Sequence, residues 1–487
     1  MKRHTTIFQL MLLIFFAVQT FGQQPLFSEF LYFSNLETSG GGPHTGSAVS
    51  FGGSDVMDGW VHSNDDLLMS SYGCPTFYGY VSTAGTAMMS SCSEAIFQGG
   101  FTEYADSIQT PPVFMLNYLR QAANYTFSAD QLIGRPGIPD SLIMTKLHFT
   151  TEGVQVYQWS YQIPPIAGDD SPTNDYYFYH NHFVADTCRM DGFHHYDFPE
   201  PEDSSAYITW NTQISDTAAI IYIQGGQVQT YGQIQGQYLV ITDKETPYLP
   251  ADPEYHEDIC YNNIWIIDDL IYADSDAESG EPLMGSPNRL GLVSGANIIY
   301  ANTLANGAAN GSEGQDLIIN AALVTFEGSI VAHYWQNTLN DESMNGPNYS
   351  DPAESKGDGR GPINFGGTTG QDYRGYINLW GAMVQNKRGY MKRNNPGPYT
   401  STIGYDKSYH YDPNLLTVAP PGFELLIAPL IGDLDLDGDL SVLDLVRLIE
   451  LALQLGLPAS QIEIYTADLD LNGLFNILDV VLLIERF

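Results

Sequence analysis

Two copies of one acidic segment stand at the C-terminal end of the chain, and no other feature limits its fold as strongly. The first copy spans residues 432–444, and the second, 35 positions later, spans residues 467–479. In each copy, acidic or amide residues alternate with leucine up to a glycine, Gly438 or Gly473, and an aspartate ends the copy. This pattern confines the backbone to a tight turn that carries several side-chain oxygens at close range.

The spacing of these oxygens predicts a calcium site in each copy. A Ca²⁺ ion takes about six to eight oxygens, which a tight loop supplies from positions 1, 3, 5, 7 and 12, with glycine at the sharp turn of position 6. Position 7 gives only a backbone carbonyl. The predicted ligands are Asp433, Asp435, Asp437, Asp439 and Asp444 in the first loop, and Asp468, Asp470, Asn472, Leu474 and Asp479 in the second. Solvated acidic turns are the alternative, and two matches in register argue against it.

On these residues, the segment 431–487 resembles a type I dockerin, the duplicated loop–helix module that folds with calcium and binds a cohesin. The resemblance implies a small all-α, EF-hand-like module with two Ca²⁺ ions, and a cohesin-like or other envelope protein as partner. The chain departs from the family at loop positions 10 and 11. Many dockerins have small polar residues there, whereas this chain has Val442-Leu443 and Ile477-Leu478. The departure puts ordinary cohesin specificity in doubt.

The residues after each loop predict two short helices with more apolar surface than a small core can bury. The first helix has one stripe of Val442, Leu445, Val446, Ile449 and Leu453, and a second face that begins with Leu448, Leu451 and Leu455. The second helix, 480–484, is apolar all round. The excess either packs on the preceding domain or binds a partner. The residues predicted to bind the partner are Val442, Leu443, Leu448, Ile477, Leu478 and Leu483.

The N-terminal residues predict export. Residues 1–22 have the pattern of a secretory signal peptide: a basic start, an apolar stretch from Ile7 to Val18, and a boundary of small residues before Gln23. The apolar stretch is too short to span a bilayer comfortably. A retained N-terminal anchor is the alternative. We therefore expect the mature chain to be secreted or to lie at the cell surface.

Four cysteines agree with an oxidising exterior. Cys74, Cys92, Cys188 and Cys260 allow three pairings. We favour Cys74 with Cys92 and Cys188 with Cys260, because near neighbours in a sheet or solenoid meet most easily and an oxidising compartment keeps them joined. Free buried thiols are the alternative.

The charge of the chain excludes some partners. It carries 57 acidic side chains against 18 basic ones, a formal net charge of -39. Such a chain repels polyanions, so nucleic acid and anionic membrane surfaces are poor partners. The acidity suits solubility in a salty, calcium-containing exterior.

The long segment between these two ends predicts a mainly β body. Short runs rich in Val and Ile, punctuated by Gly or Asn, occur at 218–223, 237–241, 263–267, 290–293, 296–300, 317–320 and 328–332. Because few helical stretches intervene, they predict a β-solenoid of the parallel β-helix kind, with β-sandwich elements as the alternative. The expected domains are a signal peptide at 1–22, an N-terminal β region at 23–165, a solenoid-like region with a His/Tyr-rich loop at 166–425, and the dockerin-like module at 431–487.

Parts of this body also resemble a known family. The stretches 55–67 with 75–81, and 381–389 with 404–413, are similar to exported bacterial domains of unknown function, some of them found with type IV pilus components. The resemblance implies placement in the envelope or outside the cell, and it implies no activity.

Motifs for catalysis are scarce in the body. The sequence has no Gly-x-Ser-x-Gly elbow, no His-Glu-x-x-His zinc helix and no phosphate-binding Gly-Lys-Ser or Gly-Lys-Thr loop. The histidines His180, His182, His194 and His195 surround Cys188 and form a candidate metal cluster, although a Tyr- and His-rich loop tethered by a disulfide is the favoured interpretation.

Two smaller groups of residues complete the candidates. His62 is a candidate catalytic residue, and a hydrogen-bonded turn is the favoured interpretation. The basic pairs Lys387-Arg388 and Lys392-Arg393 are expected to offset nearby acids.

These observations favour a structural or adhesive protein of the exterior, docked through its calcium module. The alternative is a polysaccharide-degrading enzyme, a glycoside hydrolase or a lyase, carried by the same module. A glycosidase needs two facing carboxylates at a definite separation, and no pair stands out among 57 acids. A polyuronate lyase would need basic groups, which are scarce. A polysaccharide is a candidate ligand of the body under either function.

Overall fold

The computed structural model of this 487-residue chain describes its residues in separate stretches. These are 26–39, 47–128, 142–161, 200–248, 258–301, 303, 305–306, 316–332, 336–337, 360–361, 372–389, 391–394, 402–426, 430–435, 440–455, 458–459, 461–469 and 474–486. The contacts divide the chain into two compact units, which we call the body (Phe27–Leu425) and the C-terminal unit (Leu426–Phe487). The predicted signal peptide lies outside the described residues. Within them, no helix is both long and apolar enough to cross a bilayer.

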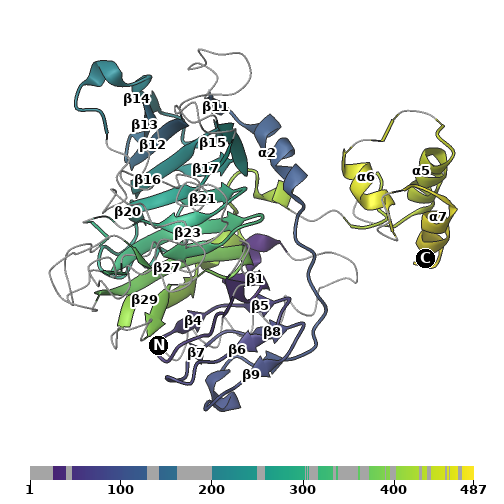
Figure 1. The fold of residues 1–487 in the computed structure, drawn as a ribbon, viewed down its shortest axis with the longest axis horizontal. Helices are drawn as coiled ribbons and strands as arrows, with labels where there is room; N and C mark the ends of the chain where they lie inside the picture. The colour runs from purple at the N-terminus through teal and green to yellow at the C-terminus, as the bar shows by residue number, and fades with distance from the viewer. Residues whose placement is uncertain are drawn as a thin grey trace, which may run out of the picture. The chain divides into compact units, whose positions relative to one another are not determined.

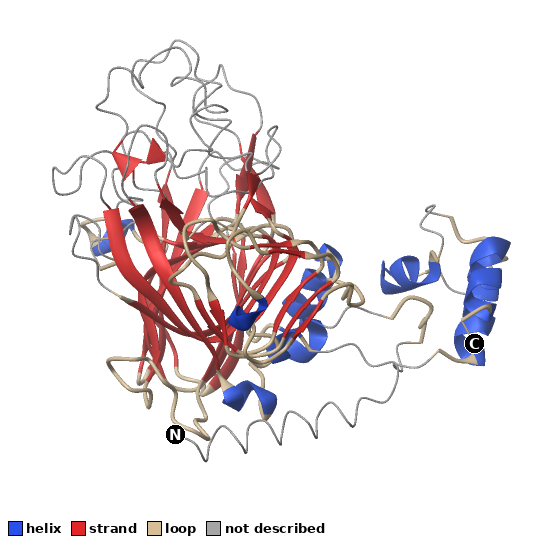
Figure 2. Ribbon diagram, turned by 90° about the horizontal axis from the view of Figure 1, so that it is seen from below, coloured by secondary structure: helices blue, strands red, loops and turns tan. Residues whose placement is uncertain are grey.

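Strands dominate the body, as Figures 1 and 2 show. They are β1 (Tyr32–Leu36), β2 (Thr38–Ser39), β3 (Ser47–Ala48), β4 (Val56–Asp58), β5 (Val61–Ser63), β6 (Leu67–Leu68), β7 (Thr76–Phe77), β8 (Val81–Thr83), β9 (Ala87–Met88), β10 (Phe101–Thr102), β11 (Tyr125–Ser128), β12 (Leu142–Thr150), β13 (Gly153–Tyr161), β14 (Thr209–Ile214), β15 (Ala218–Gln224), β16 (Gln227–Ile234), β17 (Gln237–Thr242), β18 (Glu245–Tyr248), β19 (Asp258–Tyr261), β20 (Ile264–Tyr272), β21 (Arg289–Ser294), β22 (Ile298–Tyr300), β23 (Leu317–Thr325), β24 (Ile330–Ala332), β25 (Gln336–Asn337), β26 (Arg360–Gly361), β27 (Asp372–Lys387), β28 (Lys392–Asn394) and β29 (Thr402–Tyr411). The prediction of a mainly β fold is confirmed.

Short helices interrupt the strands. They are η1 (Phe27–Glu29), η2 (Glu94–Ile96), η3 (Val113–Met115), α2 (Leu116–Ala122), η6 (Ser204–Ala206), η8 (Pro413–Leu416) and η9 (Phe423–Leu426). All seven segments that the sequence predicts as strands overlap a strand of the structure, from β15 to β24. Runs rich in Val and Ile favour strands because β-branched side chains pack well on the pleated surface of a sheet.

The largest sheet has 21 strands and mixes parallel with antiparallel pairs. One series of parallel pairs runs β11–β15–β17–β21–β23–β27–β1–β5–β8–β10. Antiparallel pairs join β12 to β13 and β13 to β14 (Figure 1). All nine residues of β23 are buried, as expected for a parallel strand covered on both faces.

The start and the end of the body meet in this sheet. Tyr32 of β1 pairs with Met383 of β27 on one side and with Val61 of β5 on the other. Next to this contact, β29 pairs in parallel with β4. The N-terminal strands therefore continue the stack that the C-terminal strands of the body begin.

The stretch between β4 and β10 contains a 20-residue repeat that sequence reasoning missed. Val61 pairs with Val81, and Val81 pairs with Phe101, so equivalent residues lie on top of one another. Gly79 stacks on Gly59, and a Cβ on Gly79 would lie 2.0 Å from the Gly59 carbonyl oxygen. The regular glycine spacing was the signal that could have revealed the repeat.

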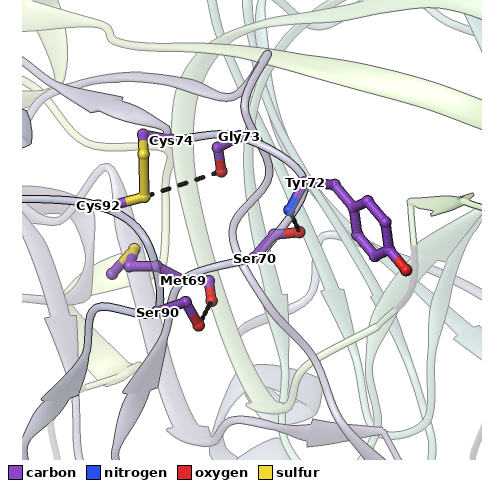
Figure 3. Close-up of a disulfide and its surroundings, with 7 residues drawn as sticks. All are labelled: Met69, Ser70, Tyr72, Gly73, Cys74, Ser90 and Cys92. Atoms are coloured by element: carbon purple, nitrogen blue, oxygen red, sulfur yellow. Dashed lines mark hydrogen bonds between the residues drawn. A yellow bond between two sulfur atoms is a disulfide. The ribbon is translucent and has the colours of Figure 1, made fainter.

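A disulfide joins two turns of this repeat (Figure 3). The Sγ atoms of Cys74 and Cys92 are bonded and the two Cα atoms are 5.5 Å apart, which confirms this pairing. Ser90 donates a hydrogen bond of 2.8 Å to the Met69 carbonyl close by. Cys188 and the side chain of Cys260 lie outside the described residues, so the second pairing stays a prediction.

The described residues of the C-terminal unit form three α-helices, α5 (Val442–Ala452), α6 (Gln461–Ala467) and α7 (Ile477–Ile484). Its small core consists of the buried residues Leu434, Leu448, Leu451, Ala467, Leu469, Val480 and Leu483. An ion pair between Arg447 Nε and Glu463 Oε1, 2.5 Å apart, joins α5 to α6. Because Leu448 and Leu483 occupy equivalent positions of the two copies, the core is built from both halves of the duplication.

Candidate metal centre and exposed apolar face

Each loop of the C-terminal unit ends in a helix start that places its last aspartate. In the first copy, Ser441 Oγ accepts a hydrogen bond of 3.0 Å from the Leu443 N–H, and Asp444 Oδ2 accepts one of 2.7 Å from the Ser441 N–H. Asn476 and Asp479 form the same capping box in the second copy. This reciprocal cap satisfies two backbone donors that a helix start leaves free. It also holds the carboxylate of loop position 12 toward the loop.

The same aspartates bind the beginning of their loops. Asp444 Oδ1 accepts hydrogen bonds from the N–H groups of Leu434 at 2.7 Å and Asp435 at 3.1 Å. Asp479 Oδ1 accepts the equivalent bond from Leu469 at 2.9 Å. The last position of each loop is thereby brought to the residues at the beginning of the loop, as a chelating loop requires.

Three of the predicted ligands converge in the first loop. Asp433, Asp435 and Asp444 each offer a carboxylate oxygen, and these oxygens lie within 4.8 Å of one another. Two oxygens bound to one Ca²⁺ at about 2.4 Å can be at most about 4.8 Å apart, so the donor set fits this ion in type and spacing. Asp433 and Asp444 are buried, and Asp435 is exposed.

The remaining predicted ligands are placed in part. In the second loop Asp479 is buried, Asp468 is half-buried and Leu474 is exposed. The other four, Asp437, Asp439, Asp470 and Asn472, lie outside the described residues. If Ca²⁺ binds, it supplies the positive charge that lets the clustered carboxylates approach one another.

The predicted partner-binding residues separate into two groups. Val442, Leu443, Ile477 and Leu478 are exposed, with relative exposures of 68%, 65%, 72% and 51%. In contrast, Leu448 and Leu483 are fully buried in the core of the unit. Their assignment to the partner surface is therefore corrected: they point into the module, where the small core needs them.

Four further apolar residues on the same helices are exposed. They are Val446, Ile449, Val481 and Ile484. Each of the eight exposed residues has its equivalent in the other copy, 35 positions away. We call these eight side chains the apolar face: Val442, Leu443, Val446, Ile449, Ile477, Leu478, Val481 and Ile484. The 35-residue offset was the signal that could have added the last four to the prediction.

His62 in the body has a structural environment. Its ring is buried in β5, with Nδ1 2.8 Å from Ser82 Oγ and Nε2 3.1 Å from Asn64 Oδ1. The ring stacks on Phe33 at a centroid distance of 5.7 Å. Burial lowers the pKa of His62, which favours the neutral ring. The favoured hydrogen-bonded role fits these contacts, although His62 lies in a strand rather than a turn.

Two of the four basic residues in the predicted pairs neutralise acids, as expected. Arg388 pairs with Glu37, and both side chains are buried. Lys392 pairs with Asp406. The side chain of Arg393 is outside the described part of the chain, and so is the histidine cluster His180, His182, His194 and His195.

One polar group on the body was not predicted. Ser408 Oγ lies 2.9 Å from His410 Nε2, and the His410 ring stacks on Trp380 at 4.5 Å. Asp58 Oδ2 is 3.7 Å from His410 Nδ1, which is longer than a hydrogen bond. The Ser–His–Asp series is thus incomplete in this geometry.

Comparisons with known proteins add no assignment. No family model, curated protein or solved structure matches this chain. The function proposed below therefore depends on the geometry of the two units.

Proposed function

We propose that the chain is a secreted or cell-surface structural or adhesive protein, and that its C-terminal unit is a calcium-dependent, dockerin-like docking module. The β body, which we infer to be solenoid-like, forms the displayed part. The module attaches it to a cohesin-like or other envelope protein. The observation that carries this proposal is the apolar face, because its side chains are exposed at equivalent positions in both copies.

The duplication of exposed apolar side chains has an energetic cost without a partner. Fully burying one Val, Leu or Ile side chain contributes about 1.5 to 3 kcal/mol, and the C-terminal unit by itself forgoes part of this free energy at each of eight exposed positions. Scattered apolar residues on a surface need no explanation, but a set repeated on two helices supports an interaction site. An apolar partner surface would bury them.

Calcium is proposed as the switch for docking. Without a cation, the carboxylates of Asp433, Asp435 and Asp444 repel one another at the distances that the loop imposes. An ion removes this repulsion and holds the loop against the start of α5. Because α5 and α7 both begin at such loops, the spacing of the apolar face depends on both sites.

The test is calcium-dependent capture by the full-length chain. The immobilised protein is exposed to envelope extract of the producing cell with calcium or with a chelator, and the captured protein is identified and bound again in purified form. We expect binding only with calcium, and a loss of at least about tenfold in Leu443→Ser/Leu478→Ser. Glu485→Gln, an exposed change outside the apolar face, is the matched control. Equal binding in the chelator, or full binding by the double variant, contradicts the proposal.

A polysaccharide-degrading body is the second candidate. The group formed by Asp58, His410 and Trp380 favours it, because acid, imidazole and indole side chains meet a sugar polymer in many sites. Incubation of the full chain with a polysaccharide panel tests it. Release of oligosaccharides that His410→Ala abolishes would place the enzymatic function first.

A further inference from the structure

A buried lysine and a buried aspartate face one another inside the body. Lys407 Nζ lies 2.7 Å from Asp55 Oδ2, and the two side chains are only 9% and 2% exposed. Lys407 belongs to β29, and the parallel register of β29 with β4, continued by one residue, sets it beside Asp55. The pair therefore connects positions that are 352 residues apart in the chain.

The surroundings of Lys407 disfavour its charged form. Arg388, a permanent cation, lies over the Phe51 ring at 3.7 Å, and Lys407 Nζ is 5.8 Å from the centroid of the same ring. Burial and the nearby Arg388 lower the pKa of Lys407, although Asp55 opposes this change. An amine is nucleophilic only in its neutral form, which the lowered pKa of Lys407 favours.

Two further groups can assist a reaction between them. The Gly52 N–H donates a hydrogen bond of 2.7 Å to Asp55 Oδ2, so it can stabilise negative charge on that oxygen. Tyr409 lies two residues beyond Lys407 on the same inward face and is fully buried. Among the described residues its hydroxyl has no hydrogen-bond partner. Burial, with Asp55 among the neighbouring groups, raises the pKa of Tyr409, so the hydroxyl keeps its proton.

We propose that Lys407 and Asp55 condense to an intramolecular amide that links the N-terminal strands of the body to β29. The Lys407 proton first passes to the Asp55 carboxylate. The amine then attacks Cγ, an Nζ–Cγ bond forms, one Cγ–O bond breaks, and the departing oxygen leaves as water with the protons of the acid and the amine. In this proposal the Tyr409 hydroxyl keeps its proton and donates a hydrogen bond to that oxygen as it leaves. No oxidant or other reactant is needed.

The buried setting distinguishes this pair from the other lysine–carboxylate pairs among the described residues of the body. Lys392 and Asp406 also form an ion pair, but the Lys392 side chain is 21% exposed. Lys244 and Glu327 are about one-third exposed. Water solvates the charged groups of these more exposed pairs and favours hydrolysis over condensation. The interior around Phe51 excludes water from Lys407 and Asp55. The proposal is independent of calcium and of docking.

Mass spectrometry of the full-length protein tests the cross-link. After reduction and denaturation, the wild-type chain should be lighter than its composition requires by the mass of one water molecule. Proteolysis should release one branched fragment that contains both Asp55 and Lys407. Two separate fragments, or the uncondensed mass, would overturn the proposal.

Variants identify the reacting groups. Lys407→Met and Asp55→Ala should each restore the full mass, and Lys392→Met, which removes the more exposed lysine, should keep the deficit. A deficit that persists in Lys407→Met also contradicts the assignment. The peptide map of the wild-type chain decides the matter even if a variant fails to fold.

Discussion

Two regions of this protein are built from internal repeats, and they use them in opposite ways. In the body, the 20-residue repeat stacks equivalent residues on one another, as Val61 on Val81. In the C-terminal unit, the 35-residue repeat leaves equivalent apolar residues, such as Leu443 and Leu478, facing solvent. A repeated residue in the body is thus explained by its neighbour in the stack. A repeated exposed residue in the C-terminal unit needs another explanation, and we propose that a partner covers it.

The largest effect is expected from a change in the glycine stack. Gly79→Ala places a Cβ 2.0 Å from the Gly59 carbonyl oxygen, so the two stacked connections between strands must move apart. We expect the free energy of unfolding of the body to fall by about 4 kcal/mol or more, measured by denaturant titration. Gly52→Ala, whose Cβ would meet only Asp55 Oδ2 at 3.8 Å, is the control. Similar stability of Gly79→Ala and Gly52→Ala would show that the stack tolerates a side chain.

The core of the C-terminal unit should respond next. Leu483→Ala removes a fully buried side chain and leaves a cavity, which costs about 2 to 5 kcal/mol. The measurement is the melting transition that belongs to α5, α6 and α7 in the full chain, followed by helical circular dichroism. If Leu483 belonged to the partner surface, as the sequence predicted, this change would leave the transition in place.

Loss of the disulfide should weaken the repeat of the body by a similar or smaller amount. Cys74 and Cys92 close a loop with a sequence separation of 18 residues. Opening a loop of this size costs about 3 kcal/mol in the chain-entropy account. Cys74→Ser/Cys92→Ser is compared with the wild-type chain by denaturant titration. An unchanged midpoint would mean that the β ladder alone sets the stability of this region.

The buried His62 predicts a modest pH dependence of the body. Burial lowers its pKa in the folded state, so the unfolded chain takes up the proton first as the pH falls below about 6.5. Stability is then full above that pH and declines below it, by at most about 1.4 kcal/mol per pH unit from this one group. His62→Gln, measured across pH 5 to 8, should show a shallower decline, and an identical slope contradicts this role.

The smallest effect on folding is expected at the apolar face. Leu478→Ser changes a side chain that is 51% exposed, so the free energy of unfolding should change by no more than about 0.5 kcal/mol. Thermal unfolding of Leu478→Ser beside Leu483→Ala separates the two roles of leucine on α7. A large loss of stability in Leu478→Ser would mean that the apolar face packs within the protein and serves no partner.

The sequence alone determined the features that depend on local spacing. Alternating oxygens, a glycine and a terminal aspartate within thirteen residues predicted that Asp433, Asp435 and Asp444 lie close together, and their carboxylates do converge. Calcium binding at this site stays a prediction. Short runs of β-branched residues between turn residues predicted the strands, because β-propensity and turn preferences are local properties of the sequence. The nearest cysteine pair was also predicted.

Tertiary structure decided what depends on contacts between distant residues. The packing of α5 against α7 decides that Leu448 is buried and Val446 is exposed. The apolar pattern of the sequence did not show which face of α5 would be buried. The insertion of β1 between β27 and β5, and the meeting of Lys407 with Asp55, arise because hydrogen-bonded ladders join strands regardless of their separation in the chain. Local patterns contain no information on which strands become neighbours, so these contacts exist only in the folded protein.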